Sequence, residues 1–330
     1  MSGARAIVGH LQRLNVQPRP SRATVQRILA KPGLTHPLGS NHAAAYYPWP
    51  VPWAINAIQA TDIITKHLRG GEVSQNSHTL ALSSHAVCLT QHWDKTTVTA
   101  TTHLLTAWAH LGRPLVHQFD NESTCGGGPT HARVLGHVAR LCLYCQIEPF
   151  FTPGYDAKRT HQLETFHSLW VAAFWSRPEF ASLAEVQPEV RLFLRWSRTV
   201  YQPPALHGKT PAQARQGFRP PALTQPLRSL IPGARLPLTA GRIHVMRKVD
   251  LHGMVTLFNE PWPVGQRWMG EYIRATLDTA LQQVSFGHKP DATANWRHLK
   301  TRQFRLQETV HEVVPEFRRN SARCREDFPS

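Results

Sequence analysis

The chain has 330 residues, 41% of them hydrophobic, which is enough for two or three domains with buried cores. Its formal net charge of +16 favours a polyanionic partner, nucleic acid or an acidic membrane surface, over the plainer reading of a merely basic protein. The absence of a long apolar run, of a signal peptide and of an even cysteine set argues against a membrane-spanning or disulfide-built protein and favours the cytosol.

The first 35 residues predict two short helices around a turn. Apolar residues recur at helical spacing from Ile7 to Leu14, and Ser21 is a suitable N-cap for a second helix that stops at Pro32-Gly33. The second helix is similar to the recognition helix of a helix-turn-helix. That reading places Ser21, Arg22, Thr24 and Gln26 against DNA, and turns Val25, Ile28 and Leu29 inward. An ordinary amphipathic helix with a solvated basic face explains the pattern equally well.

Residues 36–52 predict an extended linker, rich in proline and aromatic residues. Its aromatic side chains could stack on unpaired bases. We expect instead that they pin the linker against a core; they are Tyr46, Tyr47, Trp49 and the adjoining Trp53.

Residues 53–218 alternate between strand and helix patterns. A strand through Asp62 is followed by strands at 79–82 and 86–90, which predicts a three-stranded meander. Residues 96–111 predict a crossover helix with Val98, Leu105 and Trp108 on one face. The next elements are a buried strand at 115–119, a helix at 131–145, a strand at 148–153 and two amphipathic helices between 166 and 201.

Cys142 and Cys145 form a C-x-x-C pair inside the helix predicted at 131–145. No second such pair follows, and the two cysteines continue the apolar pattern of that helix. We therefore predict buried core thiols rather than a zinc site or a redox pair.

Three acids stand where a metal site could form. Asp62 and Asp120 end predicted buried strands, and Glu164 lies in the opening turns of a predicted helix. Carboxylates bind Mg²⁺, and two such ions roughly 3.5–4 Å apart can activate a water or 3′-hydroxyl and stabilise a leaving oxygen. Alternatively, Asp120 caps a turn and Glu164 is a solvated helix acid, whereas a buried Asp62 needs a partner or a metal.

From about Trp53 to Phe218 the chain resembles the catalytic core of the retroviral-integrase-like DDE transposases. The resemblance rests on Asp120-Asn121, on the approach from Pro153 to Glu164, and on the segment Leu206-His207-Gly208-Lys209-Thr210-Pro211-Ala212-Gln213-Ala214. It implies an α/β fold with an RNase H-like mixed sheet. It also implies a DDE site in which Asp62, Asp120 and Glu164 hold two Mg²⁺ ions, for which Mn²⁺ can substitute. Family members usually carry more helices upstream, so residues 1–35 are interpreted as a truncated helix-turn-helix.

Basic residues close to Glu164 are candidates for DNA contact. Lys158 and Arg159, in the preceding loop, are predicted to hold the DNA backbone beside the metals. His161 and His167 flank Glu164 at helical spacing and could move a proton or orient a phosphate. In a chain with 20 histidines, chance placement is the simpler explanation for both.

The C-terminal third changes to β patterning. After a Pro-rich linker at 219–238, the short strands within 239–288 predict a small β-barrel. The resemblance implies that this barrel is SH3-like, and Arg247 and Lys248 would let it grip DNA or a neighbouring protomer. Residues 289–330 are polar and basic and predict a disordered tail.

Two functions follow from these features. The first is a DNA transposase or integrase that cleaves and joins strands with Mg²⁺, acting on the double-stranded DNA of element ends and target as a homo-oligomer, without a membrane, in the bacterial cytoplasm at the nucleoid. The second is a catalytically inactive, transposase-derived DNA-binding or regulatory protein. A Mg²⁺ nuclease of RNA–DNA hybrids shares the fold but fits the flanking DNA-binding modules less well.

Overall fold

The computed structural model describes residues 11, 15–30, 45–120, 133–153, 161–176, 179–219 and 229–319. The chain divides into two compact units, Met1–Ala44 and Ala45–Ser330. None of the described helices is long and apolar enough to cross a bilayer.

In the N-terminal unit, helix α2 spans Arg22–Ala30. Ser21 caps it as predicted, because its Oγ accepts a hydrogen bond from the Thr24 amide at 3.1 Å. Val25 is buried, but Ile28 is 57% exposed, so the prediction that both turn inward is wrong for Ile28. Residues three apart on a helix differ in direction by about 60°, which is enough to separate the buried Val25 from the exposed Ile28. Most of the first predicted helix lies outside the described residues, and the helix-turn-helix stays a prediction.

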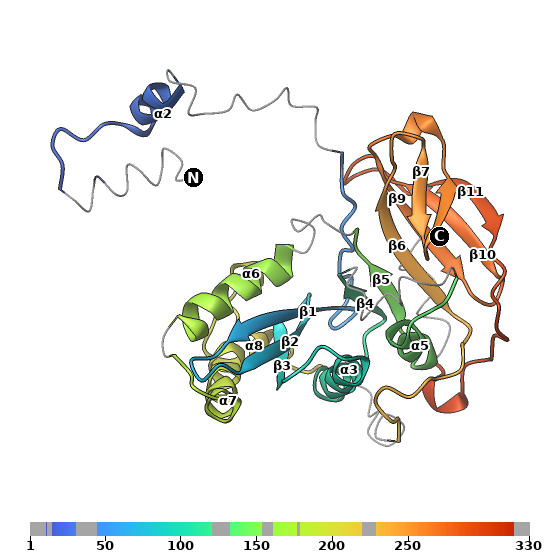
Figure 1. Cartoon of the computed structure of the whole chain (residues 1–330), viewed down its shortest axis with the longest axis horizontal. Helices are drawn as coiled ribbons and strands as arrows, with labels where there is room; N and C mark the ends of the chain where they lie inside the picture. The colour runs from blue at the N-terminus through green and yellow to red at the C-terminus, as the bar shows by residue number, and fades with distance from the viewer. Residues whose placement is uncertain are drawn as a thin grey trace. The chain divides into compact units, whose positions relative to one another are not determined.

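One mixed sheet of nine strands organises the second unit, in the order β11-β10-β9-β6-β5-β4-β1-β2-β3. Strands β1 (Ile58–His67), β2 (Val73–Ala81) and β3 (Ala86–His92) form the predicted antiparallel meander. Strands β4 (Val116–Phe119) and β5 (Glu148–Phe151) run parallel to β1. The mixed α/β sheet expected for an integrase-like core is therefore present (Figure 1).

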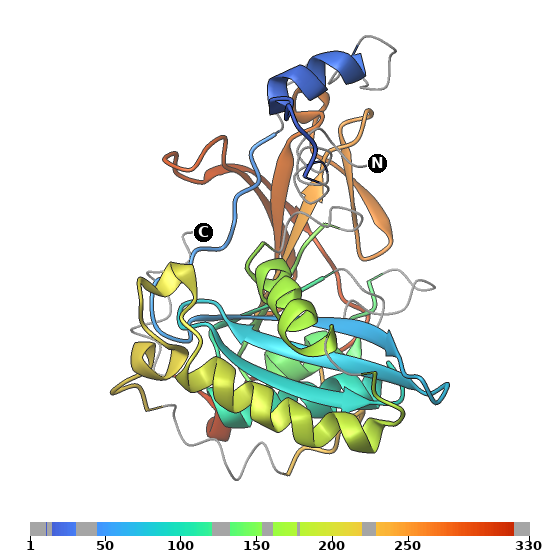
Figure 2. The same ribbon diagram turned by 90° about the vertical axis from the view of Figure 1, so that its left-hand side faces the viewer.

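Helices cover both faces of this sheet (Figure 2). On one face, α6 (His161–Trp170) and α7 (Leu183–Thr199) pack on a core that includes Ile58, Val116 and Phe150. On the other face, α3 (Thr97–Leu111) and α5 (His137–Tyr144) pack on a core that includes Phe119 and Phe151. Phe150 and Phe151 are consecutive residues of β5, and their side chains pack in the two cores on opposite faces of the sheet, because successive strand residues point to opposite faces.

Three local features bear on the sequence-based predictions. Helix α5 begins at His137, later than predicted, because Arg133 has a left-handed φ of 61° and residues 133–136 are not helical. Cys142 and Cys145 are free and buried in the core, as predicted, and burial raises the pKa of Cys145 to about 12. The Gly-Lys-Thr-Pro segment starts the short helix α8 (Pro211–Ala214), where Thr210 and Gln213 form a reciprocal capping box.

The C-terminal strands join the core sheet directly. Strand β6 (Arg242–Lys248) runs parallel to β5 and antiparallel to β9 (Tyr272–Asp278). Strands β10 (Gln283–His288) and β11 (Arg297–Gln303) complete the sheet, while β7 (Met254–Leu257) and β8 (Glu260–Pro263) form a separate hairpin. Strand pairing does not close a ring among the described residues, so the SH3-like barrel stays a prediction.

The region predicted as a disordered tail is partly built into the structure. Strand β11 lies within it, and Phe304 and Phe317 are buried in the core shared with α3 and α5. The polar composition of the segment led to the prediction of disorder. An edge strand needs few apolar residues, and only Phe304 and Phe317 anchor the segment in the core. Residues 320–330 lie outside the described part of the chain.

Candidate active site

Asp62 lies in the middle of β1 and not at its end as predicted, because the strand continues through the buried Ile64 to His67. It is half-buried, and one of its carboxylate oxygens accepts a hydrogen bond from the Ile63 amide at 2.7 Å. Its cross-strand neighbour in β2 is His78. Directly opposite residues of an antiparallel pair share a face, so Asp62 and His78 face the same side of the sheet.

Asp120 directly follows β4 and is exposed. The last paired position of the parallel β1–β4 ladder is Thr61 with Phe119, so Asp62 and Asp120 occupy the next position on the two chains. Neighbouring strands lie about 4.8 Å apart, so these two backbone positions are close although β2, β3 and α3 separate them in sequence. Thr152, just past β5, donates a hydrogen bond to Asp120 Oδ1 at 3.4 Å.

Glu164 lies in the first turn of α6 and is half-buried. This helix packs over the strand pair that carries Asp62: the ring centroids of Phe166 and Trp170 lie 5.7 and 5.9 Å from that of His78. The three predicted acids are thus placed on two adjacent chain segments of the sheet and on the helix that covers it. Within the described ranges, however, no three His, Cys, Asp or Glu side chains are grouped closely enough to hold a metal ion.

Two histidines link the sheet to the helix at this site. The rings of His78 and His167 lie 6.2 Å apart. Burial first and then His167 lower the pKa of His78 to about 3, while the backbone of Asn76 opposes that shift. The pKa of His167 is lowered by burial and by Lys66, while Glu164 opposes that shift. Sequence analysis missed His78, because its position opposite Asp62 depends on the strand register.

Another buried histidine, His117, connects β4 to β1 through hydrogen bonds. Trp108 Nε1 donates to His117 Nδ1 at 3.0 Å, so the Nε2 atom carries the proton and donates to Thr61 Oγ1 at 2.7 Å. Burial lowers the pKa of His117 to about 3, which keeps the imidazole neutral. This network holds Thr61, which directly precedes Asp62, and the His117 ring also stacks on Phe119, which directly precedes Asp120, at 4.5 Å between centroids.

The predicted DNA-contact residues have different surroundings. Ser21 caps α2, and Thr24 is half-buried, its hydroxyl 2.9 Å from that of Ser21. Arg247 is half-buried and donates to the carbonyl oxygens of Thr256, Thr152 and Met246 at 3.1, 3.2 and 2.8 Å, while Lys248 is exposed. The side chains of Arg22, Gln26 and His161, and all of Lys158 and Arg159, lie outside what the structure describes.

The predicted linker aromatics pack against the body of the unit. Tyr47 is buried, with its ring edge-on to Tyr272 of β9 at 5.1 Å and to Trp49 at 4.9 Å. The linker is therefore pinned there, as expected.

Neither a protein-family profile nor a curated protein matches the sequence. Solved structures to which the chain is similar include the HTLV-2 integrase catalytic core domain in complex with magnesium, at 15% identity and a TM-score of 0.35, covering 49% of this chain and 97% of that one. The integrase catalytic core of BIV matches at 16% identity with a TM-score of 0.36, covering 49% and 95%. A simian T-cell lymphotropic virus intasome in complex with PP2A regulatory subunit B56 gamma matches at 15% identity with a TM-score of 0.43, covering 91% of this chain and 99% of that chain. The solved structures named here are thus integrase catalytic cores and an intasome.

Proposed function

We propose that this protein is a DDE-type polynucleotidyl transferase that cleaves DNA and joins the resulting 3′ end to a target. One observation supports the proposal: β1 and β4 pair in parallel up to Thr61 and Phe119, the residues before Asp62 and Asp120, and α6, which carries Glu164, contacts β1. Two carboxylates at neighbouring positions could share a divalent cation. The net charge of +16 suits a DNA partner.

The donor set fits Mg²⁺, which prefers carboxylate oxygens and retains positions for water and phosphate. Asp62 and Asp120 would hold the ion, and Glu164 would complete the set for a second one. When bound, such ions supply an activated nucleophile and charge stabilisation at the transferred phosphate. The chain itself aligns the two aspartates through the Thr61–His117–Trp108 network and through Thr152.

The proposal extends to the partners and to the modules around the core. Double-stranded DNA is the substrate, and the chain acts on it as a homo-oligomer. The helix-turn-helix region at 1–35 and the β module at 239–288 would grip DNA on either side of the core at 53–218. Lys158 and Arg159 would contact the backbone beside the acids.

The test is a cleavage and strand-transfer assay on labelled duplex ends with Mg²⁺ or Mn²⁺. We expect Asp120→Asn to lower the rate at least about a hundredfold, because loss of a metal-binding carboxylate costs more than loss of an outer contact. Duplex affinity measured in the same buffer should be unchanged. Asp291→Asn, which removes an acid from an exposed turn, is the matched control and should retain full activity.

A catalytically inactive DNA-binding protein is the second candidate function. The observation in its favour is that Glu164 does not form a three-donor group with the two aspartates among the described residues. Duplex binding by the wild type without cleavage or joining in either metal would establish this second function and reject the first.

A further inference from the structure

A continuous chain of hydrogen bonds runs through the core between the sheet and α3. It begins at Trp108 of α3, which donates to His117 Nδ1 of β4 at 3.0 Å. His117 Nε2 lies 2.7 Å from Thr61 Oγ1 of β1, and this oxygen lies 2.5 Å from Thr79 Oγ1 of β2. Four side chains from three strands and one helix are thus joined.

From Thr79 the chain returns to α3 and ends on β3. Thr79 Oγ1 lies 2.8 Å from His103 Nε2, and His103 Nδ1 lies 2.7 Å from Thr90 Oγ1. The Thr90 hydroxyl lies 2.9 Å from Nε2 of the half-buried His92. We refer to the whole series, which starts at Trp108 and ends at His92, as the polar chain.

Trp108 fixes the direction of these hydrogen bonds, because an indole N–H only donates. His117 is buried and neutral, so its Nδ1 accepts, its proton lies on Nε2, and Nε2 donates to Thr61. Thr61 then has its own hydrogen left for Thr79. Any other arrangement would leave one of these two hydroxyl hydrogens without an acceptor among the described residues. Both threonines are buried, and an unmade hydrogen bond inside a core is costly.

The same direction continues towards the surface. His103 Nε2 accepts from Thr79, so the single proton of this neutral ring lies on Nδ1 and is donated to Thr90. Thr90 in turn donates to His92 Nε2. The polar chain therefore predicts opposite tautomers for the two buried histidines, with the proton on Nε2 in His117 and on Nδ1 in His103.

The polar chain crosses the strands that lead to the two aspartates. Strands β4, β1, β2 and β3 are adjacent in the sheet, and the chain joins all four to α3. Thr61 directly precedes Asp62, and the His117 ring stacks on Phe119, which directly precedes Asp120. Because successive strand residues point to opposite faces, the chain supports the position of Asp62 from the far side of the sheet.

We propose that Trp108, Thr79 and His103 are positioning residues for the proposed active site. One direction of hydrogen bonding holds β1 and β4 at a fixed spacing and so places Asp62 and Asp120 for a shared metal ion. Two donors or two acceptors that face each other in this chain would repel and shift the strands, and a functional site tolerates only about 0.5 Å of misplacement. The role at the acids rests on the proposed function, whereas the proton positions do not.

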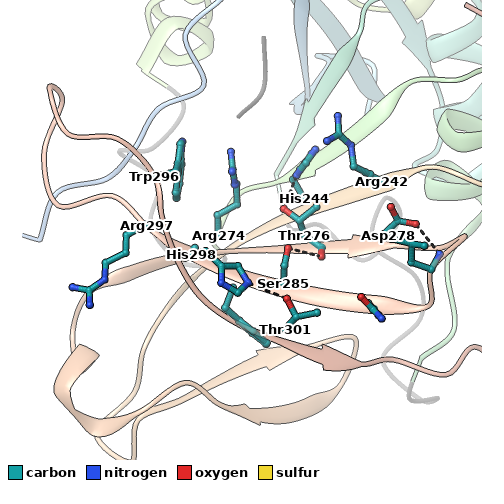
Figure 3. Close-up of a pocket in the computed structure, with 14 residues that line it drawn as sticks. Arg242, His244, Arg274, Thr276, Asp278, Ser285, Trp296, Arg297, His298 and Thr301 are labelled. Atoms are coloured by element: carbon teal, nitrogen blue, oxygen red, sulfur yellow. Dashed lines mark hydrogen bonds between the residues drawn. The ribbon is translucent and has the colours of Figure 1, made fainter. Parts of the chain in front are cut away.

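A comparable pair elsewhere in the sheet supplies a matched control. His244 Nδ1 of β6 lies 3.0 Å from Thr276 Oγ1 of β9, on the lining of a cavity of about 210 Å³ (Figure 3). Glu148 accepts from His244 Nε2 at 2.8 Å, so a carboxylate and not an indole fixes the proton of this ring. Removal of the Thr276 hydroxyl thus breaks a histidine–threonine hydrogen bond that is not part of the polar chain.

Nitrogen NMR of the full chain, isotopically labelled at histidine, tests the proton positions, since protonated and unprotonated ring nitrogens differ in chemical shift. We expect the proton on Nδ1 in His103 and on Nε2 in His117, with His103→Gln and His117→Gln spectra to assign the signals. Trp108→Phe keeps an aromatic ring but removes the N–H, and should leave His117 as a mixture of both tautomers. A proton on Nε2 of His103, or a His117 signal that Trp108→Phe leaves unchanged, would reject the one-way chain.

The positioning role is tested by the Mg²⁺ dependence of cleavage on labelled duplex ends. Thr79→Val removes one hydroxyl at nearly constant shape, and we expect the half-saturating Mg²⁺ concentration to rise about tenfold, as for other losses of support behind a metal site. Thr79→Ser keeps the hydroxyl and should stay within about twofold of the wild type, as should Thr276→Val. Duplex affinity should be unchanged in all three variants.

Melting temperatures with and without Mn²⁺ supply a readout apart from activity. Mn²⁺ should raise the melting temperature of the wild type and of Thr276→Val by the same amount, and that of Thr79→Val by less, because its acids are less well placed. If Thr79→Val and Thr276→Val instead melt equally early without metal and respond to both metals as the wild type does, the polar chain only stabilises the fold and the proposal is wrong.

The two proposals fail separately. If the wild type neither cuts nor joins DNA while the histidine tautomers are as stated, the catalytic function is rejected together with the positioning role, and the one-way chain stands. An active wild type whose Thr79→Val variant keeps the wild-type Mg²⁺ dependence rejects only the positioning role.

Discussion

Buried histidines and threonines surround the strand that carries Asp62. His117 bonds to Thr61, and His103 lies between Thr79 and Thr90, at 2.8 and 2.7 Å from their hydroxyls. Desolvation lowers the pKa of His117 to about 3 and that of His103 well below its usual value. Both imidazoles are neutral in the folded protein, and the hydrogen bond from Trp108 Nε1 to His117 Nδ1 depends on that neutrality, because a protonated Nδ1 cannot accept.

Acid should therefore destabilise the protein through these residues. Below its ordinary pKa of about 6.5, the unfolded form of His117 binds a proton that the folded form excludes, so the free energy of unfolding rises with pH across this range. We expect stability to be fully present above pH 6.5 and to fall as pH drops towards 3, with His117 accounting for on the order of 2 kcal/mol at pH 5.

Urea unfolding at pH 7, 6 and 5 tests this expectation. His117→Gln should reduce the dependence of the unfolding free energy on pH, although it also lowers stability at pH 7. Replacement of the exposed His252 by Gln is the control and should leave the dependence as in the wild type. Equal pH dependence in the wild type and His117→Gln would show that His117 does not contribute to it.

At the scale of elements, the Gly-Lys-Thr-Pro segment shows how a short motif is stabilised. His207 has a left-handed φ of 48° and Gly208 a φ of 84°, which turn the chain before Thr210 caps α8. Arg215, just after α8, donates to the Leu111 carbonyl at 2.7 Å and so ties this segment to the end of α3. The motif thus joins two helices that lie far apart in sequence.

Removal of the Thr210 cap should destabilise α8 and its attachment to the end of α3. Thr210→Ala deletes the hydroxyl that accepts from the Gln213 amide at 3.3 Å, and we expect a loss of about 1 kcal/mol in the free energy of unfolding. Thr210→Ser keeps the acceptor and should lose less than half of that. Urea denaturation of the three proteins measures the difference, and equal losses in both variants would mean that the methyl packing of Thr210, not its cap, stabilises the segment.

At the scale of the whole second unit, the nine strands form one continuous sheet across the predicted core and the predicted β module. The β5–β6 junction has ladder contacts at Phe150 and Phe151, and Glu148 binds both Arg242 and His244. The domain boundaries at 218 and 239 stay a prediction. The predicted core and the predicted β module nevertheless share strand pairing and one hydrophobic core. Phe119 and Phe151 share a core with Val284 and Phe286.

A chain ended after residue 238 should consequently fail as a stable monomer. It would leave β5 as an open edge beside an uncovered apolar core, and exposed edges of this kind pair with other chains. We expect aggregation or loss of cooperative thermal unfolding, measured by size-exclusion chromatography and calorimetry. A soluble monomer with an unchanged melting temperature would instead establish an independently stable core.

Element order was accessible from the sequence because it depends on local patterns. Alternating apolar residues gave the meander, and Thr96 and Gly112 bounded α3 close to the predicted limits. The buried face of α3 was predicted less well from the sequence. Trp108 is buried as expected, but Val98 is 54% exposed, and Leu104 is buried instead. Helix α3 contacts both the sheet and α5, and a single apolar stripe does not reveal two contact directions.

The sequence alone predicted that two acids stand at the ends of buried strands and that the cysteines belong to a core, and its strong positive charge favoured an anionic partner. Those conclusions depend on composition and on neighbours along the chain. Only the tertiary structure decided that β1 and β4 pair up to the residues before Asp62 and Asp120, that His78 faces α6, and that the Arg274 guanidinium lies over the Trp296 ring. Each of these depends on strand register and on pairing between distant segments, and a shift of one residue would turn every such side chain to the other face.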